Sequence, residues 1–404
     1  MRNFRIFAAI ADIHIGIKHI SAEEMKHQLK NKFIKPIRKL RYLDGIFILG
    51  DLMHTIVSLN SEYAELMNWF IDQIYKEARR RNNRADHTSC VVIVLKGTIS
   101  HDNDQLNNIK HYCLNDDGVD FRVYENPASD VIWENQKILI LPDVRVKRKN
   151  EILELLHRDT YDLILGHGLI DKMQFFVQES EQSPMKTVVY DSDDLLNHCN
   201  GPILFGHIHQ FQHIDHQFYY TGPFTLLERG TTNPGFLIGG IMIDDTHKYR
   251  IEHYQNDLSP QYHDWVISRE LLETYDGLEL MNAIDELLEE TGPHDLIRLK
   301  ITRGDELSSA DKVAMIESRY RNDKRIAIAK KIKTKQEEDR VKLSQEKRSR
   351  FSYILSKDDL SDILFRYFQE EVRPTITEPS SPLLSLPRPV RSVRSRRAPP
   401  VCWR

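Results

Sequence analysis

The stretch Gly45-Ile46-Phe47-Ile48-Leu49-Gly50-Asp51-Leu52-Met53-His54 contains the pattern that organises this chain. Its first half is apolar, as expected of a strand that is buried on both faces. A glycine, a carboxylate and, shortly after, an imidazole follow it directly. Open α/β sheets bind ligands at the rim formed by the carboxyl ends of their strands. We therefore expect Asp51 and His54 to lie at such a rim.

Four other apolar runs are followed by potential metal ligands in the same way. Their motifs are Asp12-Ile13-His14, Gly97-Thr98-Ile99-Ser100-His101-Asp102, Gly166-His167 and Gly206-His207-Ile208-His209. A single histidine or aspartate beside a strand is usually a structural polar group or a loop residue. Five motifs in this order, each behind a predicted strand, are hard to explain by packing alone and indicate one composite site.

The residue types at this site suit a pair of metal ions. Manganese, iron and zinc all accept a mixture of carboxylate and imidazole ligands. Two ions about 3.5–4 Å apart need a carboxylate that bridges them, and Asp51 is our candidate for that bridge. We expect one ion to be bound by Asp12, His14 and His209, and the other by His167, His207 and the loop that holds Ser100.

Three further residues are grouped as candidate catalytic residues. His101 could protonate a leaving oxygen or stabilise charge on a phosphoryl group. Asp102 would orient the loop or the His101 ring. His54, one helical turn after Asp51, could contact a substrate phosphate or steer a group that does. A plain hydrogen bond at a helix start remains the alternative for His54.

The first half of the chain alternates apolar strands with amphipathic helices, which predicts an α/β layered fold. The first strands are expected at residues 4–10, 45–49 and 91–95, with helices at 22–40 and 61–80 and Ser61 as the N-cap of the second. A second sheet packed on the first is expected from residues 137–141, 162–165, 203–205, 217–221 and 236–243.

The sequence divides into four regions. Residues 1–255 are expected to form the large domain, and 256–322 a small α+β domain with strands near 265–268 and 296–301. Residues 323–373 are expected to form a charged solvated helix or arm, followed by an amphipathic helix that docks on a partner or on the core. Residues 374–404, rich in Pro, Ser and Arg, are expected to be disordered.

Composition sets outer limits on function. The chain has 404 residues, is 40% apolar and carries a net charge of −4. From residue 323 onward there are 20 Lys/Arg against 11 Asp/Glu, so this end is basic and residues 1–322 are acidic. A basic end favours contact with nucleic acid or an acidic partner. The four cysteines lack CxxC spacing, which indicates reduced thiols in the cytoplasm. We expect no signal peptide and no membrane contact, because no apolar run reaches about 18 residues.

The ordered motifs resemble those of the calcineurin-like metallophosphoesterases, which implies a two-sheet β-sandwich flanked by helices. More narrowly, three segments resemble the SbcD-type DNA-break repair nucleases of bacteria and phages. These segments are Gly50 to His54, Tyr220-Thr221-Gly222-Pro223 and Asn233-Pro234-Gly235-Phe236. The resemblance covers residues 4–250 by motif and residues 260–370 more loosely by layout.

The resemblance implies a manganese-dependent nuclease that cleaves DNA phosphodiesters in recombination or double-strand-break repair. The implied ligands are Asp12, His14, Asp51, His167, His207 and His209, with His101 as the catalytic histidine and His54 linked to exonucleolytic action. It also implies a small domain that caps DNA, a helical segment that binds an SbcC-type coiled-coil ATPase, and a place in the bacterial cytoplasm or a phage-infected host cell. Ser100 departs from the family, which has Asn before His-Asp, and this puts the second metal in doubt.

Two alternatives stay open. The chain could be a phosphatase or small-molecule phosphodiesterase of the same fold, although a compact phosphatase does not need the region after Asn256. It could also be a DNA-binding scaffold subunit whose metal site is weakened at Ser100, against which stand the intact Asp51 and His101. A homodimer through the helix at 61–80 is a further hypothesis.

Overall fold

The computed structural model describes residues 3–82, 90–114, 118–144, 148–171, 188–214, 216–228, 231, 233–303, 307–323 and 325–332. These residues belong to the first of two compact units, Met1–Lys335. The second unit, Gln336–Arg404, lies outside the described residues, and with it the expected amphipathic helix and basic tail.

The first sheet has six strands in the order β14-β13-β1-β2-β3-β4. Its parallel part consists of β1 (Phe4–Ile10), β2 (Gly45–Leu49), β3 (Val91–Leu95) and β4 (Asp120–Tyr124). β13 (Gly235–Met242) pairs antiparallel with β1, and β14 (Tyr249–Gln255) pairs antiparallel with β13. The expectation that residues 236–243 join the second sheet is wrong. They pair with β1 in the first sheet instead. Gly239 allows this close approach, because a side chain at that position would clash with the ring of Phe7.

The second sheet also has six strands, in the order β11-β12-β10-β7-β6-β5. They are β5 (Ala128–Ile132), β6 (Gln136–Leu141), β7 (Leu163–His167), β10 (Ile203–Gly206), β11 (Gln212–Ile214) and β12 (Phe218–Tyr220). β6, β7, β10 and β12 are parallel, while β5 and β11 pair antiparallel at the two edges. A separate short pair, β8 (Leu169–Ile170) and β9 (Val189–Tyr190), follows β7.

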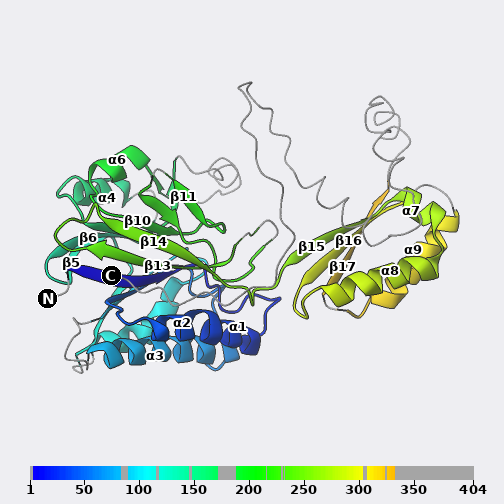
Figure 1. Cartoon of the computed structure of the whole chain (residues 1–404), viewed down its shortest axis with the longest axis horizontal. Coiled ribbons are helices and arrows are strands. Elements are labelled where there is room, and N and C mark those ends of the chain that lie inside the picture. Colours follow the sequence, from blue (N-terminus) through cyan, green and yellow to red (C-terminus); the bar gives the residue numbers. More distant parts are fainter. Residues whose placement is uncertain are drawn as a thin grey trace, which may run out of the picture. The chain divides into compact units, whose positions relative to one another are not determined.

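Helices cover the outer face of each sheet, so the large domain has four layers (Figure 1). α1 (Ala22–Gln28), the π-helical turn η1 (Leu29–Ile34), α2 (Lys35–Lys39) and α3 (Glu62–Asn82) lie on the first sheet. α4 (Lys149–Leu156) and α6 (Ser192–Asn197) lie on the second. A 3-10 helix, η2 (Asn103–Leu114), follows the loop after β3. The expected α/β class, with two sheets flanked by helices, is confirmed.

The apolar residues divide into three core clusters that match these layers. Along β1, Ile6, Ala8 and Ile10 face the helices, whereas Phe7 and Ala9 face the second sheet. Strand side chains alternate between faces, so a strand between two layers must be apolar at every position. This double burial explains the unbroken apolar runs that precede each motif.

Helix α3 begins where the sequence predicted, since the Ser61 hydroxyl accepts a hydrogen bond from the N–H of Ala64. Its apolar stripe, including Leu66, Phe70 and Ile74, is buried in the core of the chain itself. A dimer through α3 would therefore have to use the other face of this helix.

The small domain is a parallel three-stranded sheet with helices. Its elements are β15 (Tyr262–Ile267), α7 (Arg269–Thr274), α8 (Gly277–Glu290), β16 (Leu296–Arg303), α9 (Leu307–Tyr320) and β17 (Ile326–Ile332). β17 pairs with β16, so the domain does not end at residue 322 as expected. The region after residue 323 is densely charged, so the short apolar run Ile326-Ala327-Ile328-Ala329, which is typical of a strand, was not predicted as one. Among the described residues, no helix is both long and apolar enough to cross a bilayer.

Candidate metal centre

The five predicted motifs meet at one rim of the large domain, at the carboxyl ends of β1, β2, β3, β7 and β10. Backbone hydrogen bonds join the loops there: the N–H of Asp12 donates to the carbonyl of Gly50 at 3.1 Å, and the N–H of His14 donates to that of Asp51 at 3.0 Å. The N–H of His207 donates to both carboxylate oxygens of Asp12, at 3.0 and 2.9 Å. The rim thus brings together residues almost 200 positions apart in the sequence.

The backbone at the rim is strained. Asp12, His14, Asp51 and His207 have φ values of 47°, 50°, 50° and 99°, in the left-handed region that non-glycine residues seldom adopt. Each such residue costs on the order of 1–3 kcal/mol and persists where the surroundings enforce it, typically at functional sites. Four of the residues predicted from sequence carry this strain together.

One group of candidate ligands consists of Asp12, His14 and His209, whose ligand atoms lie within 4.8 Å of one another. Asp12 and His14 are buried, and the His209 side chain is 25% exposed. Glu228 accepts a hydrogen bond from His209 Nδ1 at 3.0 Å. Since a neutral imidazole carries one ring proton, this bond leaves Nε2 of His209, the atom on the Asp12 side, available as a ligand.

The second group consists of Asp51, His167 and His207, again with ligand atoms within 4.8 Å. His167 is fully buried, and its Nδ1 donates to the carbonyl of Leu49 at 2.7 Å. Nε2 of the same ring therefore faces the site, 3.4 Å from Asp51 Oδ2. The rings of His167 and His207 pack edge to face, with centroids 5.2 Å apart.

Asp51, a member of the second group, also lies close to the first. Its Oδ2 is 3.6 Å from Nε2 of His14 in the first group and 3.4 Å from Nε2 of His167 in the second. Thr98 holds this carboxylate with its backbone N–H, 2.6 Å from Oδ1, and with its hydroxyl, 3.1 Å from Oδ2. The same hydroxyl lies 3.4 Å from His167 Nε2.

The expectation that Ser100 contributes to the second ion is not supported by the geometry. Ser100 is exposed, and the hydroxyl beside Asp51 and His167 belongs to Thr98. The reason is local: the chain turns tightly after Thr98, whose carbonyl accepts from the N–H groups of both His101 and Asp102.

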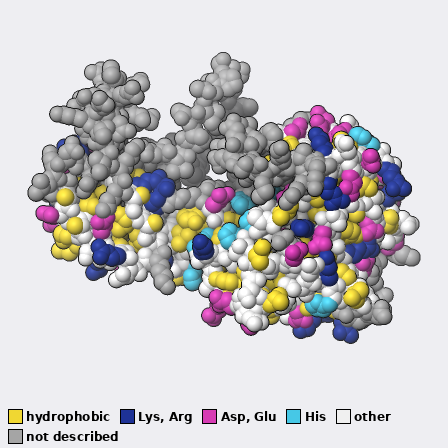
Figure 2. Space-filling model, turned by 180° about the vertical axis from the view of Figure 1, so that it is seen from behind, with side chains coloured by type: hydrophobic (Ala, Val, Ile, Leu, Met, Phe, Trp, Pro, Cys, Tyr) yellow, Lys and Arg dark blue, Asp and Glu magenta, His cyan; other side chains and the backbone are white. Residues whose placement is uncertain are grey.

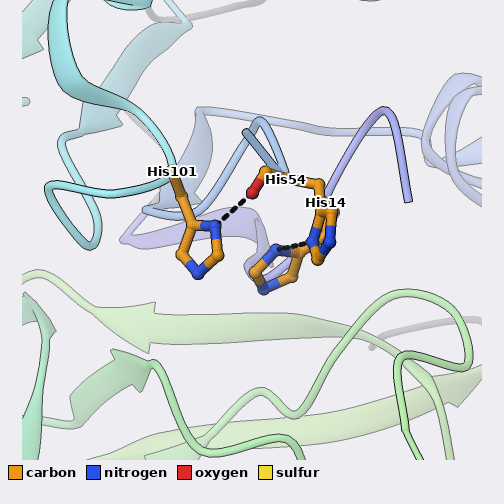
Figure 3. A group of neighbouring side chains, drawn as sticks. All are labelled: His14, His54 and His101. Carbon is orange, nitrogen blue, oxygen red and sulfur yellow. Dashed lines mark hydrogen bonds between the residues drawn. The ribbon is translucent and has the colours of Figure 1, made fainter. Parts of the chain in front are cut away.

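His101 and His54 lie beside the first group (Figure 3). His101 Nδ1 donates to the backbone carbonyl of His54, and the two rings stack with centroids 5.6 Å apart. His54 Nδ1 is 3.3 Å from Nδ1 of His14. The segment around His54 is not a helix start, because Met53 forms a bridge with Ile15 and the N–H of His54 donates to Ile15. His54 thus contacts His14 through its ring and His101 through its backbone carbonyl.

Asp102, grouped above with the catalytic residues, serves to hold the loop. It is fully buried, and its oxygens accept from the N–H groups of Met53 at 3.1 Å and Gly97 at 2.7 Å. Gly97 leaves room for this arrangement, since a Cβ there would lie 2.1 Å from the backbone nitrogen of Asp51. Asp102 is a positioning residue that ties the loop after β3 to the loop after β2.

Burial and neighbouring charges shift the pKa values of the rim residues, not all in one direction. Burial by itself would raise the pKa of Asp51, but neighbouring His167 and His14 hold it well below its ordinary value. Burial would lower the pKa of His167, but the Asp51 carboxylate raises it instead. Burial raises the pKa of Asp12 to about 6 and that of Asp102 to about 7. Burial also holds the pKa of His14 well below its usual range.

Three residues of the centre escaped prediction from sequence. Thr98 lies within one of the five motifs but was not predicted to contact Asp51. Glu228 lies in a loop, and no neighbouring motif marks it as a partner of His209. Asp143 follows β6 in Leu141-Pro142-Asp143, the same strand-then-carboxylate arrangement as the motifs, so this signal was present. Asp143 is buried, which raises its pKa, and it is close enough to His167 and His207 for their charges to lower that pKa in turn.

Comparison with known proteins does not assign the chain to a family. No family model and no curated protein matches the chain. One solved structure aligns over 100% of its own length and 62% of this chain, with 11% identity and a TM-score of 0.32. Another, GAP50, the anchor in the inner membrane complex of Plasmodium, aligns over 86% of its length and 63% of this chain, with 10% identity and a TM-score of 0.35.

Proposed function

We propose that this chain is a calcineurin-like metallophosphoesterase of the SbcD type, a dinuclear metal-dependent nuclease that hydrolyses DNA phosphodiester bonds. One observation carries the proposal: the Asp51 carboxylate lies between two sets of ligand residues, 3.6 Å from His14 and 3.4 Å from His167. A carboxylate shared between two ligand sets is the arrangement that a two-metal phosphoesterase requires.

The residues fit a pair of divalent ions. Nε2 of His14 is buried and has no hydrogen-bond partner among the described residues, although buried polar atoms rarely lack one. The Asp51 carboxylate raises the pKa of His167, and His167 lowers the pKa of Asp51, so this carboxylate carries a negative charge that a cation could share. The set of carboxylates and imidazoles suits manganese, with the two groups described above as ligands and Asp51 as the bridge.

Ions bound there would polarise a phosphoryl oxygen and lower the pKa of the attacking water. The side chains of the chain supply the remaining functions. His101 is held through Nδ1, so its Nε2 can carry a proton to the leaving oxygen or stabilise charge on the phosphoryl group. His54 fixes the orientation of His101 and His14, and Thr98 fixes that of Asp51.

DNA is the proposed substrate for two reasons. The small domain after Asn256 adds a second folded body that a compact phosphatase does not need, and the chain is basic from residue 323 onward. Binding would rest on phosphate contacts, which are independent of sequence and sensitive to salt. Lys/Arg and Asp/Glu side chains are interspersed over the face drawn in Figure 2, where histidines gather in one place. We therefore propose that an SbcC-type coiled-coil ATPase, meeting the chain in the cytoplasm, supplies part of the affinity.

The test is release of nucleotides from end-labelled double-stranded DNA with manganese, beside hydrolysis of a small aryl phosphodiester. Asp51→Asn is the control that removes the bridging charge. DNA cleavage that is lost in Asp51→Asn is the expected result. Hydrolysis of the small ester alone would favour a phosphatase of this fold, and absence of both activities would favour a scaffold role.

A homodimer is a separate question, which light scattering answers. A mass of one chain at all concentrations would exclude it.

A further inference from the structure

Besides the groups of possible metal ligands at the rim, which include His14, His54 and His101, another group lies away from it, on the outer face of the second sheet. It consists of His157, Asp194 and His198, whose ligand atoms lie within 4.8 Å of one another. His157 ends α4, whereas Asp194 lies in α6 and His198 ends it. Figure 1 shows these two helices side by side over the sheet, so the group joins two elements that are distant in the sequence.

We infer that His157, Asp194 and His198 form a site for a divalent transition-metal ion, zinc foremost, that clamps α4 to α6. Two imidazoles and one carboxylate are a ligand set that zinc accepts, and three protein ligands leave one position for water. The site is distinct from the proposed dinuclear centre and does not rest on the proposed function.

The distances already approach those of a bound ion. With metal–ligand bonds of about 2.0–2.2 Å, two ligands of a tetrahedral zinc ion lie roughly 3.4 Å apart. His157 Nε2 and Asp194 Oδ1 are 3.5 Å apart. The rings of His157 and His198 have centroids 4.9 Å apart and planes 34° apart, so both nitrogens can turn to one point.

The orientation of His198 is set in advance. Its Nδ1 donates to the backbone carbonyl of Asp194 at 2.8 Å, which leaves Nε2 as the free ring nitrogen. Metal-binding histidines typically donate their other ring proton to a carbonyl or carboxylate in this way. The alternative is a simple exposed ion pair between His157 and Asp194. Such a pair would stabilise the fold by about 0–1 kcal/mol, and it would not explain the presence of His198.

The clamp has a structural purpose. A cavity of about 170 Å³ is lined by residues of both helices, among them Ile152 and Leu156 from α4 and Asp194 and Leu195 from α6, and by residues 188–191. The helices therefore do not pack fully against each other at this point, although each is anchored on the sheet by Ile152, Leu156 and Leu195. An ion bound by residues of both helices would hold α4 and α6 together where their side chains do not pack against each other.

The test counts the zinc bound to the full chain, by equilibrium dialysis and elemental analysis. His157→Gln and His198→Gln are compared with His247→Gln, which changes an exposed histidine outside every ligand group found in the described residues. We expect each of the first two variants to bind one ion fewer per chain than the wild type, and His247→Gln to bind the same number. The same difference is expected in an Asp51→Asn background, which separates this site from the dinuclear centre.

Equal zinc content in the wild type and His157→Gln would overturn the inference. His157 is half exposed, so this variant is expected to fold even if His198→Gln does not. A zinc-dependent rise in melting temperature that is smaller in His157→Gln than in His247→Gln would support the clamp. The same rise in both variants would exclude it.

Discussion

Thr98→Val tests whether the hydroxyl beside Asp51 supports the metal centre. Valine keeps the shape of threonine and the backbone N–H that lies 2.6 Å from Asp51 Oδ1, and it removes only the hydroxyl at 3.1 Å from Oδ2. A hydrogen bond to a charged group contributes about 1.5–3 kcal/mol. Since about 1.4 kcal/mol is a factor of ten, manganese affinity should fall roughly 10- to 150-fold.

The assay is calorimetric titration of manganese into the metal-free protein, followed by turnover on labelled DNA at saturating manganese. Ser100→Ala is the matched control, because Ser100 is exposed and lies only two residues from Thr98. Thr98→Ser should restore most of the affinity. The reasoning would be refuted if Thr98→Val bound manganese as tightly as the wild type, or if Ser100→Ala lost as much affinity.

Three other outcomes follow from the structure. His101→Ala should keep manganese binding by calorimetry and lose about 10²- to 10⁴-fold in turnover, since general acid catalysis is typically of that size; normal turnover would remove its catalytic role. Arg81→Met should lower the free energy of unfolding in urea by about 1–3 kcal/mol, because the buried Arg81 donates to the carbonyls of Leu40 and Ile37, at 2.7 and 3.0 Å, which would lose this donor, while Arg79→Met on the exposed side should cost far less; equal losses would contradict this. Burial lowers the pKa of His253 to about 4, below the ordinary value of 6.5, so the unfolded chain takes up the proton first and stability is lost as pH falls from 6.5 toward 4. Between pH 7.5 and 5, the free energy of unfolding in urea should fall by up to about 2 kcal/mol more in the wild type than in His253→Phe, and equal losses in the two proteins would disprove this.

The parts of the site that sequence predicted are those fixed by strand periodicity. An apolar run ending in Gly50-Asp51 or Gly166-His167 is enough to place the polar residue at a rim, because parallel strands deliver their carboxyl ends to one edge. His14 was predicted in one group and His167 in the other, and the structure places them in two separate clusters of possible ligands.

The features of the fold and site that were not predicted depend on tertiary contacts, which leave no local pattern in the sequence. Whether Thr98 or Ser100 meets Asp51 is decided by a tight turn within one loop. Glu228 reaches His209 from 19 positions away, and nothing around it marks it as a partner. The strand at 235–242 belongs to the first sheet, where it pairs antiparallel with β1, and the sequence pattern alone does not decide between the two sheets.

The two ligand groups are connected by backbone hydrogen bonds as well as by Asp51. Asp12 belongs to the first group, yet both its oxygens accept from the backbone N–H of His207 in the second. His14 belongs to the first group, yet its backbone N–H donates to the carbonyl of Asp51. Each of these four residues except His207 is held near φ 50°, a conformation that the surrounding layers must enforce. Because the loops hold one another in this strained form, a change that releases one group should also displace the other, so the two ions are expected to be lost together.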